Sequence, residues 1–172
     1  MSRRFVTRSS SIHGKGVFAA VNIPAEEILI EYSGKRITSQ QAERLHGNNS
    51  ETGHTFLFSV NEKFLIDGNS GGNSSRWYNH SCAPNCQAQV HVNIDGDERR
   101  DKVLIESLRP IRAGEELTYD YGLDLPPPHS KRLKKIWECR CGAKNCTGTL
   151  LKPRKPVARK SAAKVDVKKA RA

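Results

Sequence analysis

The chain lacks any apolar run near the roughly 18 residues that a membrane-spanning helix needs, so membrane insertion of that kind is not expected. No apolar stretch follows its basic first ten residues, which argues against a secretory signal peptide of the usual kind. Internal repeats are absent too. What is present fits one ordinary domain: 172 residues, of which 36% are hydrophobic and 27% charged. That composition supports a core and argues against a wholly disordered chain.

Acidic residues are too few to balance the basic ones, and the basic excess gathers at one end. The chain has 29 Lys and Arg against 18 Asp and Glu, a formal net charge of +11. Residues 151–172 carry nine of these basic residues and one acid, Asp166, without apolar periodicity. Such a segment buries too little surface to offset its ordering entropy, which predicts a disordered basic arm. Its expected partner is a polyanion such as nucleic acid, the alternative being a solubilising tail or an expression remnant.

The cysteines are five, an odd number, which together with the missing signal peptide argues against a disulfide framework. Cys139, Cys141 and Cys146 fall within eight residues, in Cys-Arg-Cys-Gly-Ala-Lys-Asn-Cys. Thiolates at this spacing can occupy one face of a tetrahedral zinc ion, which leaves the fourth position open. No residue nearby resembles the general base of a hydrolytic zinc site. Closure by Cys82 or Cys86 is therefore favoured over a catalytic metal or three plain reduced thiols.

Short apolar segments broken by turn residues predict a mainly β fold with short helices. Thr38 and Gln41 are spaced as a capping box, which marks the clearest helix, over residues 38–45. Prolines at 126–128 predict a hinge before a short basic helix within residues 129–138. The expected strands are 16–21, 27–32, 55–60, 64–67, 87–94, 102–107 and 116–121. Strands 55–60 and 64–67 are expected to pair around Asn61-Glu62, and strands 87–94 and 102–107 through a loop that contains Asp95-Gly96.

Three segments are rich in groups that carry chemistry. Residues 13–18, His-Gly-Lys-Gly-Val-Phe, hold a Gly-x-Gly turn that lets the backbone approach a ligand closely. Residues 76–86, Arg-Trp-Tyr-Asn-His-Ser-Cys-Ala-Pro-Asn-Cys, are dense in polar, aromatic and thiol groups, which is typical of a loop at a functional site. Residues 114–122 place Tyr119 and Tyr121 on one face of a strand, where the two rings either line a pocket or pack in the core.

Together these segments resemble one family. Gly-Lys-Gly-Val-Phe, Glu-Tyr-Ser-Gly, Arg-x-x-Asn-His-Ser-Cys-x-Pro-Asn, Gly-Glu-Glu-Leu-Thr-Tyr-Asp-Tyr-Gly and Cys-x-Cys-x-x-x-x-Cys occur here in the order found in SET-domain protein lysine methyltransferases. The last motif is similar to the family's post-SET zinc element. The resemblance implies several small sheets around a pseudoknot, divided into a SET domain (5–122), a post-SET zinc element (123–150) and the disordered basic C-terminal arm (151–172).

The resemblance also implies two cofactors and the residues that hold them. Members of the family transfer a methyl group from S-adenosylmethionine to a lysine side chain. In such proteins the residue matching Cys82 is the fourth ligand of a structural Zn²⁺, completing the site of Cys139, Cys141 and Cys146 and leaving Cys86 free. By similarity, S-adenosylmethionine is held by His13, Lys15, Gly16, Val17, Arg76, Asn79, His80 and Trp137.

Methyl transfer requires a neutral lysine, whose ordinary pKa is about 10.4, and burial beside a sulfonium lowers that pKa. By resemblance Tyr121 is the catalytic tyrosine, and a phenol suits orientation better than proton abstraction at neutral pH. Tyr119 takes the family's Phe/Tyr switch position, which predicts mainly mono-methylation. Tyr32 is expected to border the substrate channel. Phe56 and Tyr78 are expected in the same channel, and Phe56 stands at or beside a position where relatives commonly have tyrosine. Either another hydroxyl, such as that of Tyr78, substitutes for the missing one, or the pocket is looser and the number of methyl groups transferred is less defined.

The expected substrate is a lysine of a histone tail or of another basic, DNA-associated protein, with DNA contacted through residues 151–172. Two alternatives stay open: a non-catalytic DNA- or chromatin-binding module, and a methyltransferase of ribosomal or other non-histone proteins. The expected location is the nucleus or chromatin, a host's included, and the alternative is the cytoplasm; no oligomeric state is indicated. Ala158-Arg159-Lys160-Ser161 resembles a histone-tail sequence, which makes self-methylation at Lys160 a hypothesis.

Overall fold

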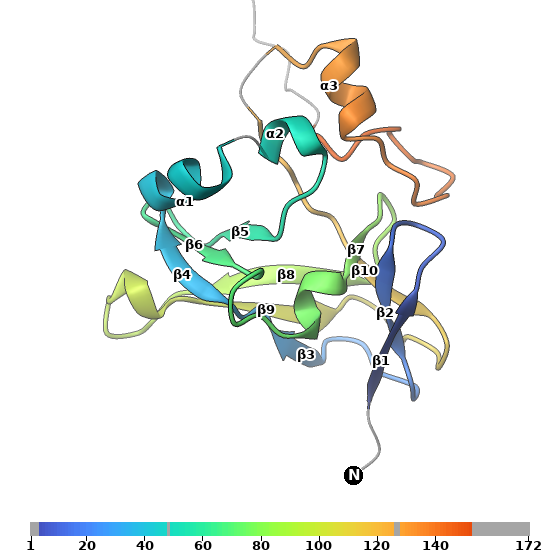
Figure 1. The fold of residues 1–172 in the computed structure, drawn as a ribbon. Coiled ribbons are helices and arrows are strands. Elements are labelled where there is room, and N and C mark those ends of the chain that lie inside the picture. The colour runs from blue at the N-terminus through green and yellow to red at the C-terminus, as the bar shows by residue number, and fades with distance from the viewer. Residues whose placement is uncertain (1–3, 48, 126–127, 153–172) are drawn as a thin grey trace, which may run out of the picture.

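The computed structural model describes residues 4–47, 49–125 and 128–152, which fold mainly as β structure in three small sheets (Figure 1). One sheet has the order β1-β2-β10-β7, from Phe5–Ser9, Lys15–Ala19, Glu116–Tyr119 and Asn79–His80. The second is β3-β9-β8, from Ile28–Glu31, Lys102–Ser107 and Cys86–His91. The third is β4-β6-β5, from Lys35–Thr38, Phe64–Asp67 and Leu57–Ser59. The predicted fold class is confirmed.

Helices are short and lie between or beyond the strands. They are α1 (Ser39–His46), α2 (Asn49–Thr52), α3 (Lys131–Ile136) and two 3₁₀ turns, Ser74–Trp77 and Glu98–Arg100. The capping box at the start of α1 is confirmed, because the Thr38 side chain accepts from the Gln41 N–H at 3.2 Å and the Gln41 side chain accepts from the Thr38 N–H at 2.9 Å. The two predicted strand pairs are confirmed as antiparallel, β5 with β6 and β8 with β9.

Three strands escaped prediction because their side chains carry no alternating apolar pattern. β1 is exposed along most of its length and is held by its pairing with β2. β4 pairs with β6. β7 has only two residues, both polar and buried, and runs parallel to β10, with Asn79 opposite Thr118 and His80 opposite Tyr119. This pairing brings the 76–86 and 114–122 segments side by side at the centre of the molecule.

The core lies where the three sheets meet, and it is built from alternate residues of the strands. Val103 and Ile105 of β9 are fully buried, as is Leu117 of β10, and Tyr78 packs with them. Because alternate residues of a strand face opposite sides, the neighbours of these apolar side chains are free to reach the surface or a site. The core thus fixes β10 and the segment before β7, from which the candidate site is built.

The C-terminal segment, residues 128–152, folds back over the sheets and places α3 beside α2 (Figure 1). Leu151 is buried and bridges to Leu123, so the folded part extends past the predicted start of the arm at residue 151. The rest of the predicted arm, 153–172 with Lys160, and prolines 126 and 127 of the predicted hinge lie outside the described residues. Within those described, no helix has the length and apolarity to cross a membrane.

Candidate active site

A cavity of about 370 Å³ lies between residues 4–125, called the body below, and the C-terminal segment 128–152, which forms its roof. It takes lining residues from the 12–15 turn, residues 52–56, the 76–80 segment, Tyr121 and residues 135–140, which are distant in sequence. The residues expected to bind a cofactor and found in its wall are His13, Lys15, Arg76, Asn79, His80 and Trp137. Gly16 and Val17 do not line it: Val17 is fully buried in the core, and Gly16 packs against Glu116.

The side-chain amide of Asn79 is held by three acceptors. Its Nδ2 lies 3.2 Å from the His13 carbonyl, 3.0 Å from the Lys15 carbonyl and 2.7 Å from Glu116 Oε1. The other oxygen of Glu116 accepts from Ser10 Oγ at 2.8 Å. Acceptors can bind only the NH₂ end of the amide, so its orientation is fixed and Oδ1 is turned away from them. Asn79 therefore offers an acceptor oxygen in the wall of the cavity.

Aromatic rings and cations line the same wall. Phe56 and Trp77 meet edge to face with ring centres 5.0 Å apart. Lys15 Nζ lies 5.2 Å and the Arg76 guanidinium carbon 4.8 Å from the centre of the Trp77 ring. Arg76 donates from Nη1 to the Gly68 carbonyl at 3.0 Å, but its buried Nε has no hydrogen-bond partner among the described residues. A buried guanidinium donor without a partner fits a ligand that brings an anionic group.

Tyr121 is held at both ends. Its hydroxyl donates to the Tyr78 carbonyl at 2.7 Å, and its backbone N–H donates to His80 Nδ1 at 3.1 Å. Since the hydroxyl proton is committed to Tyr78, the phenol oxygen can only accept further hydrogen bonds. Burial raises the pKa of Tyr121 above its ordinary value, so the phenol stays protonated at neutral pH. The phenol oxygen of Tyr121 is therefore a hydrogen-bond acceptor at neutral pH and not a proton-abstracting phenolate.

A cluster of aromatic rings adjoins Tyr121. The Tyr119 ring centre lies 5.0 Å from that of Tyr121 and 6.2 Å from that of Phe58, and Phe58 is 5.2 Å from Tyr32. The Tyr32 hydroxyl donates to the Phe56 carbonyl at 2.7 Å, so its oxygen, like that of Tyr121, can only accept further hydrogen bonds. Burial raises the pKa of both Tyr32 and Tyr119. The cluster is an apolar, aromatic setting with phenol oxygens inside it.

The structure places the Tyr78 side chain in the core, whereas Phe56 lies in the wall of the cavity. The Tyr78 side chain is only 1% exposed and packs in the core, where its hydroxyl has no hydrogen-bond partner among the described residues. Tyr78 meets Tyr121 through its main-chain carbonyl. Phe56 lies edge-on to Trp77 in the cavity wall. This geometry gives no support to the Tyr78 hydroxyl as a substitute for one missing at Phe56.

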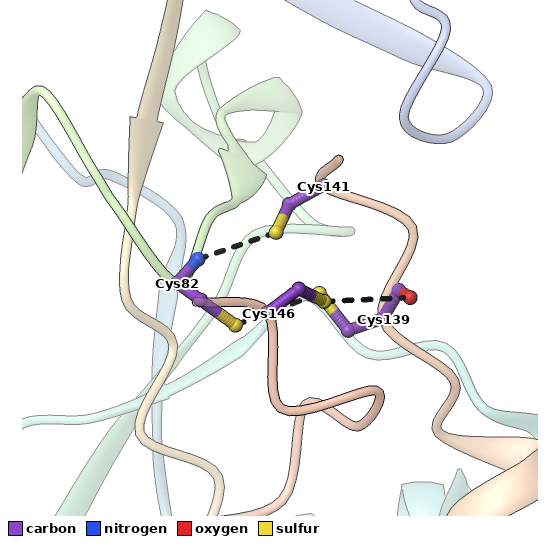
Figure 2. A group of neighbouring side chains, drawn as sticks. All are labelled: Cys82, Cys139, Cys141 and Cys146. Atoms are coloured by element: carbon purple, nitrogen blue, oxygen red, sulfur yellow. Dashed lines mark hydrogen bonds between the residues drawn. The ribbon is translucent and has the colours of Figure 1, made fainter. Parts of the chain in front are cut away.

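Four cysteine sulfurs converge on one another (Figure 2), and His80 Nε2 lies 3.4 Å from the sulfur of Cys82. The Sγ atoms of Cys82, Cys139, Cys141 and Cys146 all lie within 4.8 Å of one another, and those of Cys82 and Cys139 are 3.8 Å apart. Thiolates bound to one tetrahedral zinc at about 2.3 Å are separated by about 3.8 Å, so the donor set and its spacing fit Zn²⁺. Cys86 is fully buried in the core instead, 3.5 Å from Asn85 Oδ1.

Backbone donors prepare this cluster for a cation. The Cys82 N–H donates to Cys141 Sγ at 3.5 Å, and the Gly148 N–H donates to Cys146 Sγ at 3.4 Å. Desolvation raises the pKa of Cys141, but N–H donors from Cys82 and Ala143, together with hydrogen bonds from the Cys139 and Cys146 thiols, outweigh it and lower that pKa to about 6. A thiolate is thus available at neutral pH, and it is the form that binds metal.

The segment that carries three of the cysteines also closes the cavity. Trp137 is buried in the cavity wall, and its carbonyl accepts from the Leu150 N–H at 2.8 Å and from Thr149 Oγ1 at 3.0 Å. Asn145 Nδ2 donates to the Cys82 carbonyl at 3.1 Å, and Arg132 pairs with Glu51 of α2 at 3.0 Å. The roof of the cavity is therefore attached to the body through the cysteine cluster and α2.

Known proteins resemble this chain over most of its length. Residues 14–122 match the model of the SET domain. The chain belongs to the SET-domain family. Over 143 residues, or 82% of the chain, it is 38% identical to a protein of Emericella nidulans and 39% identical to one of Saccharomyces cerevisiae, each named histone-lysine N-methyltransferase, H3 lysine-4 specific. It spans only 11% and 12% of the lengths of those two relatives.

Sequence reasoning missed several residues that shape the SET-domain cavity. Glu116 was part of a motif, but its hold on Asn79 depends on a contact across 37 residues. His54 and Trp77 line the cavity as well, and burial, with His13 nearby, lowers the pKa of His54. The available signal for Glu116 was its place in the motif Gly-Glu-Glu-Leu-Thr-Tyr-Asp-Tyr-Gly. No local signal marked His54.

Gly16→Ala is expected to weaken cofactor binding in this SET domain at least about tenfold. An added Cβ would collide with the Glu116 carboxylate, which is fixed between Ser10 and Asn79. The carboxylate must move, and the Asn79 amide then loses one of the three acceptors that set its orientation. Calorimetric titration of the folded variant with S-adenosylmethionine measures the loss. Thermal unfolding of the variant separates a loss of affinity from a loss of fold. Equal affinities of Gly16→Ala and wild type would contradict the prediction.

Proposed function

We propose that the protein transfers a methyl group from S-adenosylmethionine to the ε-amine of a lysine in a histone or another basic protein. The observation that carries the proposal is the placement of Tyr121, a buried phenol fixed at both ends, in the wall of a cavity that also takes Asn79 and Trp137. The names of the fungal relatives support histone H3 as the first substrate to test.

S-adenosylmethionine supplies a methyl group on a cationic sulfonium when bound. The cavity volume of about 370 Å³ is within the range of small-molecule sites, and the unpartnered Arg76 Nε fits the carboxylate of that molecule. Asn79 Oδ1 suits its amine, and Trp77 and Trp137 offer apolar surface to its rings. Zn²⁺ at the four cysteines would hold the roof over the cavity.

The residues of this chain prepare the lysine amine rather than deprotonate it. The aromatic cluster excludes bulk water, which lowers the pKa of an entering ammonium group because its charged form loses hydration. Water accepts the released proton. The phenol oxygens of Tyr121 and Tyr32 then accept from the neutral amine and from methyl C–H groups, since their own protons are committed to carbonyls. Alignment of the amine with the methyl group supplies most of the rate acceleration.

Tyr119→Phe is expected to raise the number of methyl groups transferred to one lysine. Tyr119 is buried beside Tyr121, and its hydroxyl can hold a water molecule in the space that a second or third methyl needs. The wild-type product is proposed to be mainly monomethyl-lysine, and the variant is expected to give mainly di- or trimethyl-lysine. Mass spectrometry of the substrate after exhaustive reaction checks this. Dominant trimethyl-lysine from the wild type would overturn the proposed product.

The distribution of charge supports a chromatin location and a contact with DNA. Residues 128–152 contain seven Lys and Arg against one acid, Glu138. Lys131 and Lys134 on α3 are exposed and make no ion pair with a described residue. Residues 1–127 contain 14 basic and 16 acidic residues, so the positive excess lies wholly in the C-terminal part. A basic segment beside the site suits a substrate that is presented on nucleic acid.

The test is transfer of labelled methyl groups to free histones, nucleosomes and ribosomal proteins in parallel, with the wild type and a chain ending at Lys152. We expect histone H3 to be labelled first. Nucleosomes are expected to be labelled faster than free histones at low salt, with the advantage lost at high salt or without the arm. Preference for ribosomal proteins would favour the non-histone alternative. No transfer to any of them, with DNA bound, would favour a non-catalytic module.

A further inference from the structure

His80 is buried, with 5% of its surface exposed, and both of its ring nitrogens are engaged. Nδ1 lies 3.1 Å from the backbone nitrogen of Tyr121, and Nε2 lies 3.4 Å from Cys82 Sγ. A backbone N–H can only donate, so Nδ1 is the acceptor and the proton of the neutral ring sits on Nε2. Nε2 therefore donates to the sulfur of Cys82.

The surroundings of the ring agree with that tautomer. Asp120 Oδ1 lies 3.4 Å from Nδ1, but this carboxylate is 66% exposed. A proton on Nδ1 would also point at the Tyr121 N–H. The ring is thus a fixed, neutral bridge between a cysteine of the cluster and the backbone of Tyr121.

We propose that His80 is a positioning residue that couples metal occupancy of the four-cysteine cluster to the placement of Tyr121. The coupling rests on the proposed zinc site and on the proposed role of Tyr121. A metal ion fixes Cys82 Sγ, Cys82 fixes the ring through Nε2–H, and the ring fixes the Tyr121 backbone through Nδ1. N–H groups that donate to metal ligands tune and orient those ligands, so the influence runs in both directions.

The segment 78–82 thereby holds Tyr121 from two sides. The Tyr78 carbonyl accepts from the hydroxyl, and His80 Nδ1 accepts from the backbone N–H. The His80 and Tyr121 rings also meet nearly edge to face, with centres 5.4 Å apart. Release of the metal would free Cys82 at the far end of this segment. A shift of Tyr121 by about 1 Å is enough to lower the rate about 100-fold.

Two substitutions separate the two ends of the bridge. His80→Asn can place an acceptor near the position of Nδ1 but cannot reach Cys82, and His80→Gln can place a donor near Nε2 but leaves the Tyr121 N–H without its partner. We expect His80→Asn to release zinc to a chromogenic chelator about tenfold more readily than wild type, with the Tyr121 amide still protected from hydrogen exchange. His80→Gln is expected to retain zinc and to lose protection of the Tyr121 amide from hydrogen exchange. It is also expected to lower kcat with little change in the KM for the histone substrate.

The wild type provides a test that does not depend on the folding of a variant. Removal of zinc by a chelator is expected to speed exchange of the Tyr121 amide at least tenfold, while the Leu117 amide, in strand β10, stays protected. The coupling is overturned if Tyr121 exchanges equally with and without zinc, or if the Asn and Gln variants behave alike. Protein purified without any zinc would overturn the metal site itself, whereas stoichiometric zinc with unchanged exchange overturns only the coupling.

Discussion

Tyr121→Phe is expected to lower kcat about 100-fold or more while the fold and cofactor affinity remain. The substitution removes the hydroxyl that donates to the Tyr78 carbonyl at 2.7 Å, and with it the phenol oxygen offered to the amine. The ring loses one of its two anchors, and an amine misplaced by about 1 Å reacts about 100-fold more slowly. Single-turnover methyl transfer, with thermal unfolding as the check on folding, measures the effect.

Tyr78→Phe is the matched control for the loss of a phenol oxygen. Its hydroxyl is buried in the core without a hydrogen-bond partner among the described residues, and the carbonyl that serves Tyr121 remains. We expect kcat within about twofold of wild type, since buried hydroxyls without partners contribute little. A large loss in Tyr78→Phe, or full activity in Tyr121→Phe, would contradict the assigned roles. Full activity in Tyr121→Phe would favour the alternative that the protein is a non-catalytic DNA- or chromatin-binding module.

Removal of the metal from the cysteine cluster is the second change with a large expected effect. Cys146→Ser, or chelation of the wild type, is expected to reduce cofactor affinity at least 100-fold. Three of the four cysteines lie on the segment that brings Trp137 into the cavity wall, and the fourth ties it to the body. The free energy of zinc binding to such a cluster also contributes to the folding of the segment. Zinc content by mass spectrometry and calorimetric titration with S-adenosylmethionine measure the two losses.

Cys86→Ser provides the control, because it also replaces a cysteine but lies away from the cluster. Cys86 is fully buried on β8, where burial raises the pKa of its thiol to about 12. The substitution is expected to lower stability, since it puts a hydroxyl in an apolar core, and to leave zinc content at one per chain. Loss of zinc from Cys86→Ser, or its retention in Cys146→Ser, would show that the cluster is not the metal site.

Two kinds of feature could be predicted from the sequence. Where a signal is local, as in the capping box of Thr38 and Gln41 or the strand pair around residues 61–62, the side chains involved lie within a few residues of one another. Where a signal is a motif, the family constrains several residues at once, and the order of five such motifs identified the SET domain. β1 and β4 carry neither signal, and both were missed. β7 was missed as a strand although its two residues belong to a motif, because the motif does not specify their pairing with β10.

The sequence by itself determined the family, the mainly β class and the set of groups available for chemistry, because these depend on residue types, spacing and motif order. Only the tertiary structure decided which of these groups meet. It brought Cys82 to the C-terminal cysteines and left Cys86 in the core, it turned the Tyr78 hydroxyl inward and its carbonyl toward Tyr121, and it set Glu116 on Asn79. Each outcome depends on which side of a backbone faces a distant segment, and that is fixed by packing across the whole chain.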